Sequence, residues 1–115
     1  MKLPNLERAA IDIAKLTGYV LNANHPEGRH KARVFLSALG IGANDARWFA
    51  DAIRIAVGNA DALLQADTEW GTIYRVDVEI KRTERCAMVR TAWLCKQEET
   101  KLVTCFVIGE CHETS

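Results

Sequence analysis

The spacing of hydrophobic residues changes once along this chain, and the change limits the folds that the chain can adopt. Up to about residue 59, hydrophobic side chains recur every three or four positions, which is the period of an amphipathic helix. From residue 72 they alternate with polar side chains, as in a strand with one buried face. We therefore predict an α+β fold in which about three N-terminal helices pack on an antiparallel sheet of about four strands.

Capping residues and glycines give the bounds of the predicted helices. The first covers residues 6–15, after a cap at Asn5 and before Gly18, and residues 19–21 are expected to be a short extended run. The second starts at residue 27 or 28 and ends at residue 39. The third is capped by residue 44 or 45 and ends near residue 57. Their spacing predicts these core residues: Leu6, Ala9, Ala10, Ile13, Ala32, Phe35, Leu36, Leu39, Trp48, Phe49, Ala52, Ile53, Ala56 and Val57.

Four strands are predicted, over residues 62–68, 72–80, 86–96 and 102–108. Their connections are short, so consecutive strands should pair antiparallel. Alternation places the following residues on the buried face: Tyr74, Val76, Val78, Ile80, Val89, Thr91 and Trp93. We expect a single domain over residues 1–115, helical in 1–59, with the sheet in 60–108 and a frayed tail in 109–115.

Charge and composition exclude several classes of protein. The chain has 15 basic and 15 acidic side chains, which argues against a protein that coats nucleic acid regardless of sequence. Residues 1–40 nevertheless hold six basic and three acidic groups, which suits a local site for an anion. No stretch reaches the roughly 18 apolar residues of a membrane span, and the N-terminus lacks the apolar run of a secretory signal. We expect a cytoplasmic protein that does not bind membranes.

The four cysteines all lie in the last 30 residues, at positions 86, 95, 105 and 111, and none of them forms a Cys-x-x-Cys motif. A cytosolic domain of this length needs no disulfide, so we predict four reduced thiols. Cys105, Cys111 and His112 do not have the spacing of a structural zinc site. We therefore expect neither a metal nor another cofactor.

The segment that most strongly indicates chemistry is 25–33, which reads His-Pro-Glu-Gly-Arg-His-Lys-Ala-Arg at the start of the second predicted helix. A helix N-terminus already carries partial positive charge, so Arg29 and Lys31 there would favour a bound anion. Gly28 would let such an anion approach the backbone closely. The alternative is a solvated basic turn in which Arg29 pairs with Glu27.

Several motifs resemble those of a family of uncharacterised bacterial small domains. Residues 3–5 read Leu-Pro-Asn, residues 15–22 Lys-Leu-Thr-Gly-Tyr-Val-Leu-Asn, residues 25–32 His-Pro-Glu-Gly-Arg-His-Lys-Ala, and residues 89–93 Val-Arg-Thr-Ala-Trp. The resemblance extends to the last strand, where that family has Arg-Leu-Val-Thr-Ala-Tyr-Pro. This chain departs from the family there at Lys101, Cys105, Phe106 and Val107.

The predicted order of elements, helices first and then a four-stranded antiparallel sheet, is also similar to that of small bacterial ribonucleases of the barnase, EndoU, colicin and RelE types. This likeness implies a metal-independent ribonuclease-like, RNA-binding effector of a toxin–antitoxin system or mobile element, which cleaves RNA by acid/base transesterification. Such chemistry needs a base, an acid and cations around the phosphate. The expected catalytic residues are His25 or His30 for the proton transfers, Arg29 and Lys31 for the phosphate, and Thr91 and Thr104 for hydroxyl hydrogen bonds.

The competing hypothesis is a non-enzymatic binding protein, such as an antitoxin or a phage-encoded inhibitor. It would grip an acidic partner or a nucleoprotein through the 25–33 segment. Phe106 and the absence of net charge favour this hypothesis, whereas the histidine, arginine and lysine cluster favours the enzyme. Both hypotheses imply RNA or another anionic ligand, together with a cognate protein partner.

Overall fold

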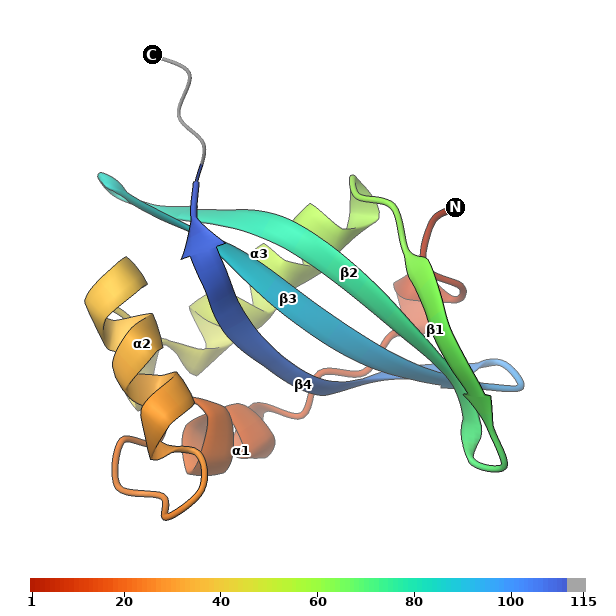
Figure 1. Cartoon of the computed structure of the whole chain (residues 1–115), viewed down its shortest axis with the longest axis horizontal. Helices are drawn as coiled ribbons and strands as arrows, with labels where there is room; N and C mark the ends of the chain where they lie inside the picture. Colours follow the sequence, from red (N-terminus) through yellow and green to blue (C-terminus); the bar gives the residue numbers. More distant parts are fainter. Residues whose placement is uncertain (112–115) are drawn as a thin grey trace.

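The computed structural model describes residues 1–111, in which a four-stranded antiparallel sheet follows the helical half of the chain (Figure 1). The strands are β1 (Leu63–Thr68), β2 (Gly71–Arg82), β3 (Arg85–Lys96) and β4 (Glu99–Glu110). They lie in the order β1-β2-β3-β4, so each strand pairs with its neighbour in the sequence. The predicted α+β class and antiparallel meander are confirmed.

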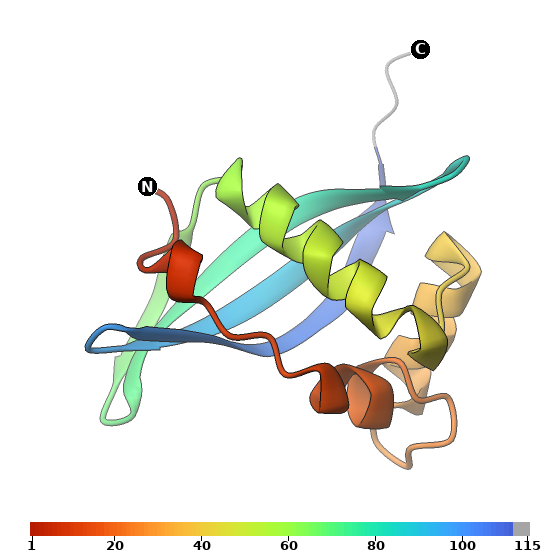
Figure 2. The same ribbon diagram turned by 180° about the vertical axis from the view of Figure 1, so that it is seen from behind.

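Three α-helices, two 3-10 turns and one π-helical turn precede the sheet. The α-helices are α1 (Ile13–Lys15), α2 (Arg29–Leu39) and α3 (Ala46–Gly58). The 3-10 turns are η1 (Leu6–Arg8) and η3 (Ala43–Asp45), and η2 (Leu16–Val20) is a π-helical turn. α3 crosses one face of the sheet and contacts β2, whereas α2 contacts β3 and β4 (Figure 2). None of the helices in residues 1–111 is both long and apolar enough to cross a membrane.

The N-terminal segment differs from the prediction, because part of it pairs with the sheet. The amide of Ala10 donates to the carbonyl of Thr100 at 2.8 Å, and its own carbonyl accepts from the amide of Leu102 at 2.9 Å. Helical turns resume after Asp12, whose side chain caps α1, and continue through Gly18 as η2. The predicted single helix over residues 6–15 and the predicted extended run at 19–21 are therefore wrong.

The central strand β3 supplies the largest side chain in the core. The predicted inner faces of β2 and β3 are buried, with Tyr74 partly exposed. The hydroxyl of Thr91 donates to the carbonyl of Val76 at 2.7 Å and accepts from the indole nitrogen of Trp93 at 2.8 Å. Thr91 is completely buried, so both hydrogen bonds hold the core together and neither is open to solvent.

The core faces of the two long helices are confirmed except at one residue in each. Phe35 of α2 and Phe49 of α3 are fully buried and meet edge to face, with ring centroids 5.0 Å apart. Leu36 is 54% exposed, contrary to the prediction. Trp48 is exposed as well, because it lies at the margin of α3, where the guanidinium of Arg82 stacks 4.9 Å from its ring.

The prediction of four reduced thiols is also wrong, because Cys86 and Cys111 form a disulfide. Cys86 lies near the start of β3 and Cys111 directly follows β4. The pairing of Ala87 with Glu110 places the two cysteines at adjacent positions across the ladder, with Cα atoms 5.7 Å apart. Cys95 and Cys105 are free. Residues 112–115, including His112 and most of the predicted frayed tail, lie outside the described residues.

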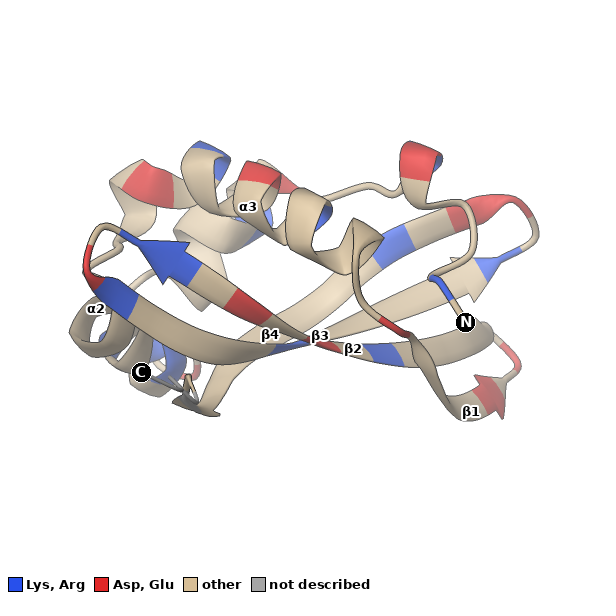
Figure 3. Ribbon diagram, turned by 90° about the horizontal axis from the view of Figure 1, so that it is seen from above, with Lys and Arg blue, Asp and Glu red and all other residues tan. Residues whose placement is uncertain are grey.

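Charged residues of both signs are distributed along α3 and along the strands rather than separated onto two faces (Figure 3). Two ion pairs in the described residues join the helical half to the sheet: an exposed one of 3.4 Å between Arg8 and Glu98 of the β3–β4 turn, and a shorter one between Asp45 and Arg82. Arg82, at the end of β2, donates to Asp45 at 2.9 Å, and Asp45 also accepts from the amide of Gly42 at 2.9 Å. The hydrogen bond from Arg82, and after it the bond from Gly42, lowers the pKa of Asp45.

We predict that the Thr91→Val variant is less stable than the wild type by about 1–3 kcal/mol, since it leaves the buried indole N–H of Trp93 without its acceptor and removes the hydroxyl bond to the Val76 carbonyl. Thr91→Ser keeps the hydroxyl and should lose less, about 1 kcal/mol for the missing methyl group. Urea denaturation measures both. A valine variant as stable as the wild type would show that these hydrogen bonds contribute nothing.

Asp45 should make the free energy of unfolding depend on pH in the acid range. Its folded-state pKa is lowered, so its contribution is full above the unfolded-state pKa of about 3.9 and is lost as the pH falls through the folded-state value. Asp45→Asn removes the charge paired with Arg82, so it should cost up to about 1 kcal/mol at pH 7 and much less near pH 2. Denaturation at both pH values, with the exposed Asp51→Asn as control, measures this. An equal cost at both would contradict it.

Candidate functional site

Lys31, on the first turn of α2, extends its side chain to the edge strand of the sheet. Its ammonium donates to the hydroxyl of Thr104 on β4 at 3.3 Å. It lies 5.3 Å from the ring centroid of Phe106 and 5.9 Å from that of Tyr19. The side chain is half-buried, so these neighbours fix a positive charge at the edge of the sheet.

Lys31 forms no ion pair in the part of the chain that the structure describes. A second lysine adds to the positive charge there. Burial raises the pKa of the Cys105 thiol to about 12, and the positive charges of Lys31 and Lys15 act in the opposite direction. Both lysines therefore lie close enough to the middle of β4 for their charges to act together on a third group. The local charge favours an anion.

Two shallow pockets flank Lys31. One has a volume of about 250 Å³ and the other about 480 Å³. The smaller is lined by His30, Lys31, Val34, Phe106 and Val107, and the larger by Lys15, Tyr19, Lys31, Val103 and Thr104. Because Lys31 belongs to both, a ligand phosphate bound at its ammonium could extend into either side.

Of the predicted site residues, Lys31, Thr104 and His30 are brought together, and the other three are not. Thr91 is in the core with its hydroxyl already bonded. Arg29 is exposed and lines neither pocket that flanks Lys31. The Nδ1 atom of His25 accepts hydrogen bonds from the amides of residues 27 and 28, each at 3.0 Å, so this ring stabilises the turn before α2.

Gly28 also has a different role from the one that the sequence predicted. A side chain at this position would collide with the backbone carbonyl of Tyr19. Gly28 is buried, so it permits the turn before α2 to pack against η2 rather than an anion to approach the backbone. The carbonyl of Tyr19 fills the space that the sequence analysis assigned to the anion.

Tyr19, Phe106 and Lys15 complete the surroundings of Lys31, although the sequence analysis did not assign them to the site. Phe106 could have been found from alternation, since Cys105 on β4 is buried and the side chains of residues 104 and 106 point the other way. Tyr19 lies within one of the motifs shared with the resembled family. No periodic signal marks Lys15.

On β3, the register partner of Phe106 is Arg90, whose charge is already paired. Arg90 makes a bidentate pair with Asp77 at 2.9 and 3.1 Å, and Arg75 adds a longer contact to Asp77 at 3.7 Å. Asp77 is shared by both arginines, so it offsets only part of the positive charge on this face of the sheet. A ligand bound at Lys31 and Lys15 would therefore find further positive charge beside the site.

Comparisons with known proteins place the chain in a family without assigning it an activity. Comparison with curated proteins and comparison with solved structures each gave no match. A family model described as "Domain of unknown function (DUF6883)" matches residues 2–109. Since the match covers nearly all of the sequence, including both halves of the candidate site, the chain belongs to the DUF6883 family of domains of unknown function.

Proposed function

We propose that this protein is a metal-independent ribonuclease-like effector that binds RNA at Lys31. The observation that carries the proposal is a half-buried lysine with a hydroxyl and two aromatic rings around it and no carboxylate paired with it in residues 1–111. A cation held in this way is ready to bind an anionic group. An adjacent aromatic ring such as Phe106 offers a surface on which a base can stack.

The two pockets suggest how the proton transfers are divided. In-line cleavage of RNA needs a base at the 2′-oxygen and an acid at the leaving 5′-oxygen, on opposite sides of the phosphate. His30 lines one pocket and Tyr19 the other, with Lys31 between them. His30 takes the proton of the 2′-hydroxyl, the 2′-oxygen attacks phosphorus, and the 5′-oxygen leaves with a proton from the hydroxyl of Tyr19. The products are a 2′,3′-cyclic phosphate and a 5′-hydroxyl.

Lys31 and Thr104 have supporting roles in this mechanism. The ammonium of Lys31 stabilises the extra negative charge of the pentacoordinate phosphorus, the point at which electrostatic stabilisation has its greatest effect. The hydroxyl of Thr104 holds that ammonium at the edge of β4. We place the activity in the cytoplasm, in a toxin–antitoxin or mobile-element context, where a cognate protein partner would restrain it.

A binding protein without activity is the second candidate, and two observations favour it. Phe106 has no hydroxyl where the resembled family has tyrosine. The ring of His30 makes no hydrogen bond within the described residues that would orient it as a base. In this case the site around Lys31 grips RNA or an acidic protein surface without turnover.

The decisive experiment measures cleavage of a short single-stranded RNA in EDTA by the wild type and by Lys31→Ala. We expect the variant to lose roughly a hundredfold in kcat/KM. Arg33→Ala is the matched control, because it removes an exposed cation two residues further along α2, about 200° around the helix. The same RNA carrying 2′-O-methyl groups should not be cut, and His30→Ala should flatten the acid limb of the pH–rate profile.

The same materials distinguish the second candidate. A binding protein leaves the RNA intact, and Lys31→Ala then weakens binding and reduces the slope of log K against log salt by about 1, whereas Arg33→Ala has a smaller effect. Absence of both cleavage and RNA binding by the wild type would contradict the proposed RNA ligand. Cleavage that Lys31→Ala leaves unchanged would remove the site from the mechanism.

A further inference from the structure

A second cluster of reactive side chains lies at the opposite end of β4 from the hairpin that joins it to β3. Cys86 and Cys111 form the disulfide, and the Sγ atom of Cys86 lies 3.4 Å from the Oε1 atom of Glu79 on β2. The two sulfurs and this carboxylate all lie within 4.8 Å of one another. Three potential metal ligands from three neighbouring strands or strand ends therefore converge on one point.

The ladder explains the convergence. Cys86 pairs with Lys81 of β2, and Glu79, two residues before Lys81, points to the same face of the sheet as Cys86. The pairing of Ala87 with Glu110 brings Cys111 alongside from β4. Backbone pairing therefore holds Glu79 and Cys86, and Cys111 directly follows the last paired residue of β4.

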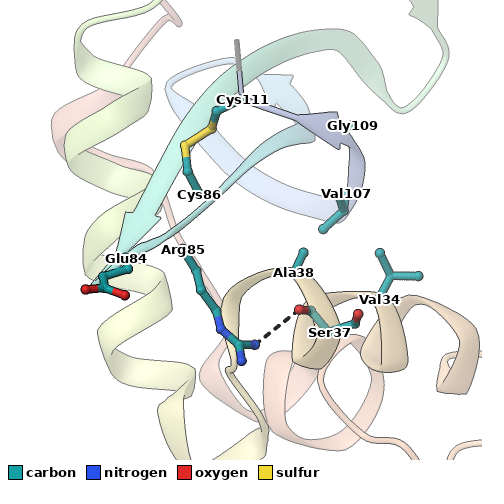
Figure 4. Close-up of a pocket in the computed structure, with 9 residues that line it drawn as sticks. All are labelled: Val34, Ser37, Ala38, Glu84, Arg85, Cys86, Val107, Gly109 and Cys111. Carbon is teal, nitrogen blue, oxygen red and sulfur yellow. Dashed lines mark hydrogen bonds between the residues drawn. A yellow bond between two sulfur atoms is a disulfide. The ribbon is translucent and has the colours of Figure 1, made fainter. Parts of the chain in front are cut away.

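The cluster is open to small molecules. Cys86 and Cys111 line a pocket of about 800 Å³ between the β2–β3 hairpin, the end of β4 and α2 (Figure 4). Arg85 fixes the far wall by donating to the carbonyl of Ser37 at 3.1 Å, which is the bond drawn in Figure 4. Both cysteines are only partly buried, so a reductant or an ion can reach the sulfurs.

The redox state decides what the cluster can bind. As a disulfide, the sulfurs carry no negative charge and are poor ligands. In a reducing compartment, a cellular dithiol delivers two electrons and two protons, becomes a disulfide itself and leaves two thiols at Cys86 and Cys111. The proposed cytoplasmic location is such a compartment. Reduction would then leave two thiols beside a carboxylate.

We propose that the reduced protein binds one Zn²⁺ ion through the thiolates of Cys86 and Cys111 and the carboxylate of Glu79, with water as the fourth ligand. Two thiolates and a carboxylate suit zinc better than magnesium or calcium, which prefer oxygen ligands alone. Each thiol releases its proton when the ion binds.

The existing spacing is close to what zinc requires. With Zn–S bonds of about 2.3 Å, a tetrahedral ion holds its two sulfurs about 3.8 Å apart, and a sulfur and an oxygen slightly closer. The distance from Cys86 to Glu79 is already 3.4 Å, so the main change is the separation of the two sulfurs once their bond is broken. Lys81, whose ammonium lies 3.2 Å from Glu79, must turn away, which its exposed position allows.

This site is separate from the one around Lys31, and it rests on the proposed cytoplasmic location but not on the proposed ribonuclease activity. The cysteine-lined pocket and the pocket of His30 share Val34 and Val107 but no charged residue. Zinc binding can therefore be measured without RNA, and its outcome is independent of any ribonuclease activity.

The test uses the full chain, reduced with a phosphine, desalted without oxygen and titrated with Co²⁺ as a spectroscopic substitute for zinc. We expect one equivalent of Co²⁺ to give intense sulfur-to-cobalt charge transfer and tetrahedral d–d bands, both abolished by Zn²⁺. Cys86→Ser and Cys111→Ser should lose these bands, and Glu79→Gln should weaken binding about tenfold or more. Cys95→Ser is the matched control and should bind normally, and the oxidised wild type should not bind.

A second measurement does not depend on the folding of any cysteine variant. In the reduced wild type, Zn²⁺ should slow alkylation of Cys86 and Cys111 at least tenfold, read by mass spectrometry of each peptide, and should leave Cys95 unprotected. Absence of cobalt bands in the reduced wild type, bands that survive Cys86→Ser, or equal alkylation with and without zinc would each overturn the proposal.

Discussion

The burial of alternate residues along β3 determines where the functional side chains of both neighbouring strands lie. Successive strand side chains point to opposite faces, so burying Val89, Thr91 and Trp93 fixes the register of the strands beside them. On β4 this register puts Cys105 in the core opposite Thr91 and turns Phe106 away from it. A slip of one residue would bury Phe106 and expose Cys105. The candidate site therefore depends on the packing of a strand that contributes no side chain to it.

The edge position of β4 explains how a helix can supply the central cation. β4 lies at the edge of the sheet, and within residues 1–111 the backbone of Ala10 pairs with it through a single isolated bridge, at Lys101. α2 contacts the strand further along, so the long side chain of Lys31 can cross to the hydroxyl of Thr104. Lysine at a sheet edge also discourages another chain from pairing there. Here the same charge lies between two pockets, and an anionic ligand can use it.

Much of the fold could be predicted from the long periodic segments. Features that depend on irregular backbone could not be predicted. β2, β3 and α2 follow their hydrophobic patterns closely, and their predicted bounds are within two residues of those observed. The spacing of the first helix looked regular, but Ala10 gains more from pairing with β4. Among the site residues, sequence identified His30, Lys31 and Thr104 by chemical type. The contact between Lys31 and Thr104 requires knowing that α2 lies beside β4, and bulges in β4 hid the pairing of Cys86 with Cys111.

The crosslink between Cys86 and Cys111 joins residues 25 positions apart, and those positions span the β3–β4 hairpin and no helix. Topologically, the oxidised protein is a closed ring of two strands with the rest of the chain attached at one end. The ring lowers the conformational entropy of the unfolded chain, which stabilises the folded protein by roughly 3–4 kcal/mol. This restriction acts on the hairpin alone. The last residues of β4 cannot leave β3 while the ring is closed. Opening it makes the C-terminal end of the sheet the part that can detach first, while the helices and β2 remain in place.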